Sequence, residues 1–348
     1  GVHEVPAEFE SIQTAIAIAQ DGDVILVSPG TYTGIGGSII DTGGKALTIR
    51  ALGSPEETVL HGQGARRVVY CNSGETSKTV IEGFTLTGGR SSDGAGVYCN
   101  GSSPMLVRCI ITGNTSSGAY MGTGGGISCY NSYLTLTECI ISNNTGSNEQ
   151  HNGGGIYCSG GSPMFIDCSV MANSIGSGEF SYGGGIYIHS SSPTFAACRV
   201  SNNSSGNEWS WPGSGGGIMC AGSVPLLGDS TVCCNWPDQI AGNWSDGGGN
   251  IVSDICPTDC QCNEIDDQDE IADGTSFDCD QDGVPDECEI DCDGDGLIDD
   301  CDSEPDQDGN GVPDNCDPDC NDNGIADGVE TLFGWADDCD GDAVPDDC

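Results

Sequence analysis

Hydrophobic and polar residues alternate along short segments of the first 250 residues. In one segment Ile156 and Cys158 alternate with the more polar Tyr157, and the segment from Ile166 to Val170 repeats the alternation. This period of two is typical of β-strands that bury one face, whereas a helical repeat would show an apolar rhythm of 3.6 residues. The pattern therefore predicts a β-rich region.

These predicted strands recur at a regular interval of about thirty residues. Glycine triplets, each followed by a short apolar strand, end at Gly126, Gly155, Gly185, Gly217 and Gly249. Aligned coils such as GISCYNSYLTLTECIISNN and GIYCSGGSPMFIDCSVMAN share their pattern. Because one strand cannot bury its apolar face alone, successive coils must stack about 4.8 Å apart in a parallel solenoid.

Asparagine occupies one equivalent position in successive coils, at the turn after the third strand. The column comprises Asn114, Asn144, Asn173, Asn203 and, in a looser coil, Asn235. Stacked amides can hydrogen-bond along the column and satisfy turn groups that would otherwise be buried unpaired. We therefore expect a buried asparagine ladder.

The first thirty residues predict a cap and a first coil. Ile12, Ala15, Ile16 and Ala19 lie on one side of a short helix that can plug the open end of a stack. A strand follows from Val24 to Val27, and a turn at Pro29 and Gly30.

Here the sequence resembles the right-handed parallel β-helix family that includes pectate lyases and pectin methylesterases. The resemblance covers residues 1–253 and implies an all-β right-handed solenoid with an N-terminal capping helix. It says little about function, because this fold hosts lyases, hydrolases, tailspikes, adhesins and structural proteins.

Charge divides the chain into two regions. Of 54 acidic residues, 35 lie at or after Asp254, and no Lys or Arg follows Arg199. We therefore expect a second domain over residues 254–348. A net charge of −46 excludes nucleic acid and anionic membranes as partners.

The acidic region contains five copies of a short loop. Oxygen-bearing side chains lie at positions 1, 3, 5, 9 and 12 of the loop. Position 6 is glycine in four copies, and position 7 is always apolar, which leaves its carbonyl to a metal. Calcium takes six to eight such oxygens from about a dozen residues. The predicted ligands are Asp278, Asp280, Asp282, Val284, Asp286 and Glu289; Asp291, Asp293, Asp295, Leu297, Asp299 and Asp302; Asp306, Asp308, Asn310, Val312, Asp314 and Asp317; Asp319, Asn321, Asn323, Ile325, Asp327 and Glu330; and Asp338, Asp340, Asp342, Val344 and Asp346.

We interpret these copies as tandem calcium loops with about five ions, against the alternative of a disordered acidic tail. The loops begin 13 to 19 residues apart, too close for the two helices that flank an EF-hand loop. They resemble thrombospondin type 3 repeats and, more loosely, dockerin loops, in which calcium serves as the core. A further copy read from Ile265 through Asp267 and Asp269 has Glu270 at the glycine position, so we do not count it as a full site.

Twenty-two cysteines indicate an oxidising, extracellular location. In the solenoid, one column comprises Cys71, Cys99, Cys129, Cys158 and Cys220, and another comprises Cys109, Cys139, Cys168 and Cys198. Disulfides between coils fit these columns best; disulfides within a coil and a buried ladder of free thiols are the alternatives. In the acidic region we expect disulfide staples. We also expect one bond from Cys233 or Cys234 to Cys256, Cys260 or Cys262, and a zinc site at the last three is an alternative.

The solenoid shows no convincing catalytic constellation. The outward position before the second cysteine column is occupied in turn by Arg108, Glu138, Asp167, Ala197 and Asp229. Glu138 and Asp167 could form the carboxylate pair of a retaining glycosidase, but we favour a surface ladder in which Arg108 neutralises Glu138. The four histidines, His3, His61, His151 and His189, do not converge, and we expect surface positions for them.

Tyrosines suggest a second outward surface. Tyr98, Tyr157 and Tyr187 share a column, with Tyr130 one position on and Trp209 and Trp211 in a long turn. The column could stack sugar rings or pack on another subunit, or it could consist of ordinary strand-face aromatics.

These patterns predict a secreted, calcium-stabilised structural or adhesive protein without enzymatic activity, which self-assembles into an extracellular filament or surface layer. The chain begins without methionine and has no apolar segment near eighteen residues, as expected of a mature secreted product. The alternatives are a polysaccharide lyase or hydrolase of the pectate-lyase-like superfamily and a monomeric adhesin for neutral glycans.

Overall fold

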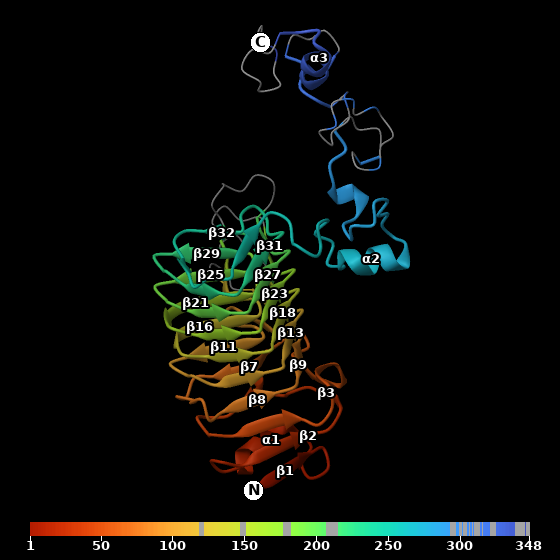
Figure 1. Cartoon of the computed structure of the whole chain (residues 1–348). Coiled ribbons are helices and arrows are strands. Elements are labelled where there is room, and N and C mark those ends of the chain that lie inside the picture. The colour runs from red at the N-terminus through yellow and green to blue at the C-terminus, as the bar shows by residue number, and fades with distance from the viewer. Residues whose placement is uncertain are drawn as a thin grey trace. The chain divides into compact units, whose positions relative to one another are not determined.

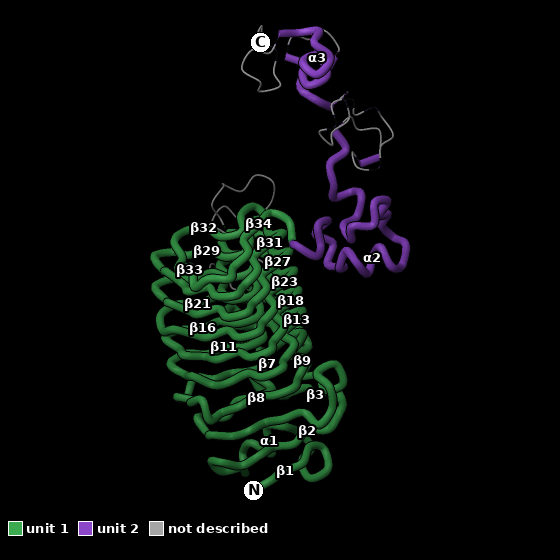
Figure 2. Tube along the Cα trace, viewed as in Figure 1, with its two compact units in different colours: residues 1–256 green, residues 257–348 purple. Residues whose placement is uncertain are grey.

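The computed structural model describes most of the chain. It describes residues 1–117, 122–146, 151–176, 182–206, 215–292, 316–320 and 325–337, together with residues 297, 298, 301, 305, 307, 309, 314 and 345. The chain separates into two compact units, residues 1–256 and 257–348 (Figure 2). Each unit is described here by itself.

The first unit is a parallel β-helix whose strands stack rung upon rung (Figure 1). Among the described residues, ten strands form its longest sheet: β1 (Val2–Val5), β2 (Val24–Val27), β5 (Thr48–Ala51), β8 (Val80–Glu82), β12 (Met105–Val107), β17 (Thr135–Thr137), β22 (Met164–Ile166), β26 (Thr194–Ala196), β30 (Leu226–Gly228) and β33 (Ser245–Asp246). The described part of a second sheet has nine: β3 (Gly30–Tyr32), β6 (Thr58–His61), β9 (Thr85–Thr87), β13 (Ile110–Thr112), β18 (Ile140–Ser142), β23 (Ser169–Met171), β27 (Arg199–Ser201), β31 (Thr231–Cys233) and β34 (Ile251–Ser253).

The third sheet carries the tyrosine column noted in the sequence. Within the described ranges it contains eight strands: β4 (Ser38–Asp41), β7 (Arg67–Cys71), β11 (Val97–Asn100), β16 (Ile127–Ser132), β21 (Ile156–Gly161), β25 (Ile186–His189), β29 (Ile218–Ala221) and β32 (Ile240–Ala241). Short strands complete some rungs: β10 (Arg90–Ser91), β14 (Thr115–Ser116), β19 (Thr145–Gly146), β24 (Ser174–Ile175), β28 (Ser204–Ser205), β15 (Gly122–Thr123) and β20 (His151–Asn152). Neighbouring strands pair in parallel, for example β16 with β21.

The expected cap is confirmed. Helix α1 (Ile12–Ile18) buries Ile12, Ala15 and Ile16. Ser11 caps its first turn, and the Lys45 ammonium donates to the carbonyl oxygens of Ile16, Ala17 and Ala19 at its last turn. These bonds satisfy end groups that the helix itself leaves open. The 3-10 turn η1 (Pro55–Glu57) lies between β5 and β6.

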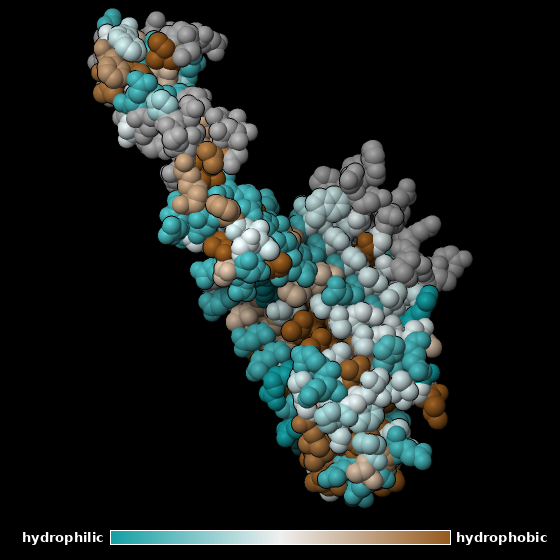
Figure 3. Space-filling view, turned by 90° about the vertical axis from the view of Figure 1, so that its right-hand side faces the viewer, coloured by the Kyte–Doolittle hydropathy of each residue, from teal (hydrophilic) through white to brown (hydrophobic). Residues whose placement is uncertain are grey.

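Apolar side chains of equivalent positions stack inside the solenoid. Phe165 and Phe195, on adjacent rungs, have ring centroids 4.7 Å apart and are fully buried. Burying such a side chain contributes about 1.5–3 kcal/mol. On the view in Figure 3, hydrophobic surface residues form small separate groups among hydrophilic ones.

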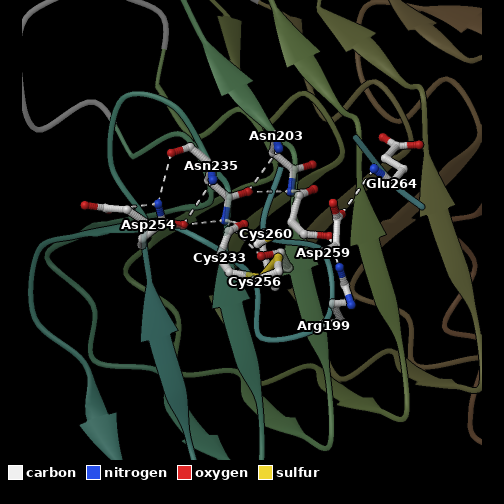
Figure 4. Close-up of a disulfide and its surroundings, with 12 residues drawn as sticks. Arg199, Asn203, Cys233, Asn235, Asp254, Cys256, Asp259, Cys260 and Glu264 are labelled. Carbon is white, nitrogen blue, oxygen red and sulfur yellow. Dashed lines mark hydrogen bonds between the residues drawn. A yellow bond between two sulfur atoms is a disulfide. The ribbon is translucent and has the colours of Figure 1, made fainter. Parts of the chain in front are cut away.

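The asparagine ladder is confirmed and is one residue longer than expected. The Asn173 amide donates to Asn203 Oδ1 at 3.0 Å. Asn203 donates likewise to Asn235 at 2.9 Å (Figure 4). Asn235 in turn donates to Gln239 Oε1 at 2.9 Å, so a glutamine ends the ladder. Asn114 and Asn144 continue the ladder toward the N-terminus.

The glycine triplets let adjacent rungs approach closely. A Cβ atom on Gly155 would lie 2.8 Å from the Gly185 carbonyl oxygen and 2.9 Å from Asn173 Cγ. These contacts are shorter than real Cβ atoms tolerate, so a side chain here would push the rungs apart.

The disulfides expected between coils are absent, and this prediction is wrong. The free, buried cysteines are Cys71, Cys99, Cys109, Cys129, Cys139, Cys158, Cys168, Cys198 and Cys220. Their columns are as expected, since Cys99 pairs in register with Cys129. The thiols serve as small apolar core groups, and in the second column they also donate to backbone carbonyls, as Cys139 does to Leu106.

The bond expected near the end of the solenoid is confirmed as Cys233–Cys256 (Figure 4). Cys256, Cys260 and Cys262 are all disulfide-bonded, so the zinc alternative is wrong.

The second unit contains short helices between loops: α2 (Asp267–Asp273), the 3-10 turn η2 (Asp286–Cys288) and α3 (Asp327–Phe333). Helices α2 and α3 end at Gly274 and Gly334, which adopt the left-handed conformation that favours glycine. None of the helices in the described ranges combines the length and apolarity needed to cross a membrane.

Candidate functional site

The tyrosines form a continuous ladder on the outer face of the third sheet. Tyr70 and Tyr98 pair in register on β7 and β11, and Tyr157 and Tyr187 pair on β21 and β25. Between these pairs the same position of β16 is Ser128. The Tyr130 ring fills this gap, with centroids 5.8 Å from Tyr98 and 5.3 Å from Tyr157. We call the five tyrosines (70, 98, 130, 157 and 187) the tyrosine ladder.

The ladder presents ring edges rather than ring faces. Tyr70 and Tyr98 stack at 5.5 Å with planes 14° apart, and Tyr157 and Tyr187 stack at 5.6 Å with planes 5° apart. Their faces therefore contact one another. Stacking of sugar rings on the column was one alternative drawn from the sequence; a ligand at these two pairs would instead meet aromatic edges and phenolic hydroxyls.

An arginine anchors the first rungs of the ladder. The Arg67 guanidinium carbon lies 5.2 Å from the Tyr70 centroid and 4.5 Å from the Tyr98 centroid. Arg67 Nη2 donates to Ser91 Oγ at 2.7 Å and to the Asp93 carbonyl at 2.8 Å. Burial lowers the pKa of Arg67, although the Asp93 carboxylate opposes that shift. The cation–π contacts fix the guanidinium against the rings.

A carboxylate lies beside Arg67 at the edge of the ladder. Asp93 Oδ1 accepts a hydrogen bond from Thr123 Oγ1 at 2.9 Å, and Oδ2 accepts one from Ser92 Oγ at 2.8 Å. Tyr130 Oη lies 2.7 Å from Thr123 Oγ1, and burial raises the pKa of Tyr130. Arg67, Asp93, Thr123 and Tyr130 thus form a polar cluster that can exchange hydrogen bonds with a ligand. Neither Asp93 nor Arg67 was predicted from the sequence, because Arg67 begins β7 whereas Asp93 lies in the turn before β11, so the two do not share a repeat position.

His151 is buried near this cluster, so its expected surface position is wrong. Its side chain is 1% exposed, and Nδ1 lies 3.2 Å from Ser116 Oγ. Burial lowers its pKa. The signal that could have located it is Gly122 on the adjacent rung, where a Cβ would lie 1.8 Å from the imidazole.

The turn before the second cysteine column carries the proposed glycosidase pair. Glu138 and Asp167 occupy adjacent rungs at positive φ, 53° and 48°, and both are exposed. The prediction that Arg108 neutralises Glu138 is wrong. Arg108 pairs with Glu82, which also accepts from Arg50 Nε at 2.6 Å. These turns lie between the first two sheets, away from the tyrosine ladder.

In the second unit, the first predicted calcium loop brings its acids together. Asp278, Asp280 and Asp282 each place a carboxylate oxygen within 4.8 Å of the others. The Gly283 amide donates to Asp278 Oδ2 at 3.2 Å, and the Val284 amide donates to Asp282 Oδ1 at 2.8 Å. The Asp282 amide lowers the pKa of Asp280, but desolvation and the neighbouring Asp282 and Asp278 carboxylates together outweigh it, and that pKa is raised. Crowded carboxylates of this kind favour a bound cation.

Described parts of other loops repeat one hydrogen-bond pattern. The amide at position 2 donates to the acid at position 9, from Cys279 to Asp286 at 2.8 Å and from Cys320 to Asp327 at 3.1 Å. The amide at position 9 donates to the residue before the loop, as Asp286 does to Phe277 at 2.8 Å. This frame holds the acid at position 9 against the start of the loop.

The predicted calcium ligands that lie among the described residues are Asp278, Asp280, Asp282, Val284, Asp286, Glu289, Asp291, Leu297, Asp314, Asp317, Asp319, Ile325, Asp327 and Glu330. The predicted ligands outside the described residues are Asp293, Asp295, Asp299, Asp302, Asp306, Asp308, Asn310, Val312, Asn321, Asn323, Asp338, Asp340, Asp342, Val344 and Asp346; Trp209 and Trp211 also lie outside them.

Disulfides join consecutive loops by a simple rule. Cysteine at position 2 of one loop bonds to cysteine at position 11 of the next, in Cys279–Cys301 and Cys292–Cys316. No such bond can join the third loop to the fourth, because Gln307 occupies position 2 of the third loop and Val329 occupies position 11 of the fourth. The staples therefore tie neighbouring loops rather than closing a single one.

Two solved structures are similar to this chain. The crystal structure of pectate lyase Pel9A shares 17% identity at a TM-score of 0.47, covering 71% of this chain and 65% of that chain. The pectin methylesterase from Aspergillus niger shares 13% identity at a TM-score of 0.34, covering 76% of this chain and 88% of that chain. At these identities the likeness concerns the fold. No curated protein matches the sequence.

These structures correct one expectation. We predicted a protein without enzymatic activity; both similar structures are named as enzymes, a pectate lyase and a pectin methylesterase, so that prediction is withdrawn.

The family assignment rests on the sequence match itself. The profile described as "Right handed beta helix region" matches residues 67–252, more than half of the chain. The matched region coincides with the stacked rungs from β7 to β34. The chain therefore belongs to the right-handed β-helix family.

Proposed function

We propose that this is an extracellular carbohydrate-active protein whose β-helix binds a neutral polysaccharide along the tyrosine ladder and whose second unit binds calcium. The observation that carries the proposal is the ladder with its polar cluster. It combines the aromatic edges, hydroxyls and fixed guanidinium of the third sheet with a carboxylate at the edge of the ladder.

A repeating surface suits a repeating ligand. The rungs follow one another about every 4.8 Å, so the ladder offers an aromatic edge and a hydroxyl at each step along the solenoid axis. A polysaccharide lying along this axis can repeat the same contacts with successive sugars. A net charge of −46 and only eight Lys and Arg residues favour a neutral polymer over an acidic one.

Asp93 is our candidate for acid–base chemistry on the bound polymer. Its carboxylate lies at the edge of the ladder, and a general acid or base must reach the reacting group directly. Glu138 and Asp167 follow strands of the first sheet, so a polymer on the ladder does not meet them. They serve as matched controls.

Removal of ladder hydroxyls tests binding. The triple change Tyr98→Phe, Tyr157→Phe and Tyr187→Phe keeps the stacked rings and removes three hydroxyls. Affinity electrophoresis and calorimetry on a panel of polysaccharides should show binding weakened by about tenfold or more, as expected for lost hydrogen bonds. Tyr133→Phe, an exposed tyrosine outside the ladder, should bind like wild type. Equal affinity of the triple variant and wild type would refute the proposed surface.

Product release on the same panel tests catalysis. Asp93→Asn should abolish turnover of the bound polysaccharide, while Glu138→Gln and Asp167→Asn should retain it. Turnover that survives Asp93→Asn but is lost in Glu138→Gln would move the active site to the turn between the first two sheets.

Calcium in the second unit is the other half of the proposal. The residues that would hold it are carboxylates, amide oxygens and the position 7 carbonyls, an all-oxygen donor set that suits a hard cation. Residues 257–348 contain no Lys or Arg, so no basic side chain of this unit can neutralise them. Bound calcium would supply the missing countercharge and join the loop acids. Extracellular calcium and the disulfides fit the same compartment.

A further inference from the structure

We infer that residues 259–270 form an additional divalent-cation loop, suited to calcium. The sequence analysis aligned this segment from Ile265 and rejected it. The structure places the start of the loop six residues earlier, at Asp259. This inference rests on the calcium binding proposed for the later loops, and the experiment below separates the two.

The new register supplies oxygen at the expected positions. Counting from Asp259 as position 1, oxygen-bearing side chains lie at Gln261, Asn263, Asp267 and Glu270, which are positions 3, 5, 9 and 12. Ile265 falls at the apolar position 7. The fourth loop, which begins at Asp319, has the same arrangement with Asn at positions 3 and 5.

The backbone matches the first predicted loop. Cys262 and Glu264, at positions 4 and 6, have positive φ values of 58° and 72°. Gln281 and Gly283 hold the same positions at 66° and 94°. Glutamate thus adopts a conformation that favours glycine, and this non-glycine residue hid the loop from sequence reading.

The hydrogen bonds match as well. The Glu264 amide donates to Asp259 Oδ2 at 3.1 Å (Figure 4), as the position 6 amide does in the first predicted loop. The Cys260 amide donates to Asp267 Oδ1 at 3.0 Å, and the Asp267 amide donates to the Thr258 carbonyl at 3.0 Å. Both bonds recur in the first predicted loop.

The disulfide pattern of the later loops, from position 2 of one loop to position 11 of the next, includes this loop too. Cys260, at position 2, bonds to Cys288, at position 11 of the following loop. The segment is therefore joined to its successor in the same way as the later loops are joined.

A buried carboxylate oxygen supports cation binding in this loop. Asp267 and Glu270 are each 5% exposed, much like Asp327 and Glu330 at the same positions of the fourth loop, which are 4% and 5% exposed. Glu270 Oε1 accepts from Asn263 Nδ2 at 2.8 Å, but Oε2 is buried without a hydrogen-bond partner. A buried charged oxygen without a partner is costly, and a bound cation would satisfy it.

The donor set favours calcium over zinc or copper, because it contains carboxylate, amide and carbonyl oxygens and no free thiol or imidazole. The proposed side-chain ligands include three acids, whereas the first predicted loop has five. Since ligand charge tunes affinity, this site should be among the weaker ones.

Calcium counting on the full chain tests the site. Equilibrium dialysis with metal analysis at saturating calcium should find one ion fewer in Glu270→Gln than in wild type. Asp269→Asn, an exposed acid at position 11 that is no ligand, should bind as many ions as wild type. Glu289→Gln, at position 12 of the first predicted loop, should also lose one ion.

The outcomes separate the two proposals. An unchanged count in Glu270→Gln, with one ion lost in Glu289→Gln, would overturn this inference and keep calcium binding elsewhere. Absence of calcium from wild type would overturn both.

A second variant covers the case in which Glu270→Gln unfolds the unit and loses several ions. Glu264→Gly removes the left-handed strain at position 6, so one class of site in a calcium titration should bind several-fold more tightly. An identical titration for Glu264→Gly and wild type would then decide against the site.

Discussion

At the scale of single residues, the solenoid depends on buried polar side chains that connect rungs. Glu75 is an example that the repeat pattern did not reveal. Its Oε1 accepts from Thr42 Oγ1 at 2.9 Å and from the Gly44 amide at 3.0 Å, and its Oε2 accepts from the Ser73 amide at 2.9 Å and from Ser102 Oγ at 2.7 Å. One carboxylate thereby ties together residues of three successive coils.

The charge of Glu75 should contribute stability that depends on pH. Burial alone would raise its pKa, but the hydrogen bonds from Ser73, Ser102 and Thr42 outweigh burial and hold that pKa below its ordinary value. A lowered folded-state pKa gives stability that is fully present above the unfolded-state pKa of about 4.3 and is lost as pH falls through the folded-state value. Glu75→Gln should therefore lower the free energy of unfolding by about 2 kcal/mol at pH 7.

Urea denaturation across pH 3–7, with calcium present, measures this effect. The difference between wild type and Glu75→Gln should shrink as pH falls below the unfolded-state pKa of about 4.3, because the unfolded chain then binds a proton that the folded carboxylate does not. Glu10→Gln, an exposed acid near the cap, should differ little from wild type at any pH. A difference that stays constant down to pH 3 would contradict the assigned role of the charge.

At the scale of elements, the spacing between adjacent rungs is set by the side chains and glycines that pack between them. The glycine triplets permit close backbone approach, and the asparagine ladder then binds the turns from Asn114 to Gln239. The tyrosine ladder on the outer face also depends on contact between adjacent rungs, because the Tyr130 ring fills the space beside Ser128 and contacts the rings on both neighbouring rungs. Each feature depends on identical spacing in successive rungs.

A methyl group in a glycine triplet should disturb this spacing. Gly155→Ala would place Cβ against the next rung and against Asn173, and overpacking of this kind typically costs about 1–3 kcal/mol. We expect a lower free energy of unfolding and weaker protection of the neighbouring amides in hydrogen exchange. Gly228→Ala is the matched control, because nothing lies within 4 Å of a Cβ at that strand position. Equal stability of the two variants would show that the triplets do not set the rung spacing.

At the scale of the whole molecule, the two units should owe their stability to different sources. The β-helix buries stacked apolar side chains, whereas the second unit places acids at regular intervals and joins loops by disulfides. Calcium binding to the folded loops would stabilise the second unit by mass action.

Removal of calcium should therefore unfold the second unit and spare the β-helix. With a chelator, hydrogen exchange in residues 257–348 should become fast, while amides of β7 to β31 should keep their protection. Magnesium at the same concentration should restore less order than calcium, because it prefers a smaller octahedral site. Unchanged exchange in both units after chelation would refute the calcium proposal. Self-assembly stays a prediction, and electron microscopy of the same samples would reveal calcium-dependent polymers.

Much of the fold could be predicted from the sequence because its determinants are local and repeated. The coil period, the cap at Ile12 and Ile16, and the asparagine column all follow from spacing along the chain. A parallel stack converts equal spacing into direct contact, so a one-dimensional pattern was sufficient. The grouping of Asp278, Asp280 and Asp282 also follows from spacing within one short loop, whereas calcium binding there stays a prediction.

Other features required the tertiary structure. Whether stacked cysteines bond or remain thiols depends on side-chain packing that equal spacing does not determine, and Cys99 and Cys139 remain free. Arg67 and Asp93 meet because the turn before β11 lies against the start of β7 on the adjacent rung. The loop at Asp259 became visible through the backbone angle of Glu264, since sequence alone gives no reason to expect glutamate in a left-handed conformation. Sequence spacing thus determined the repeating frame of this protein, and packing between distant residues decided the chemistry on its surface.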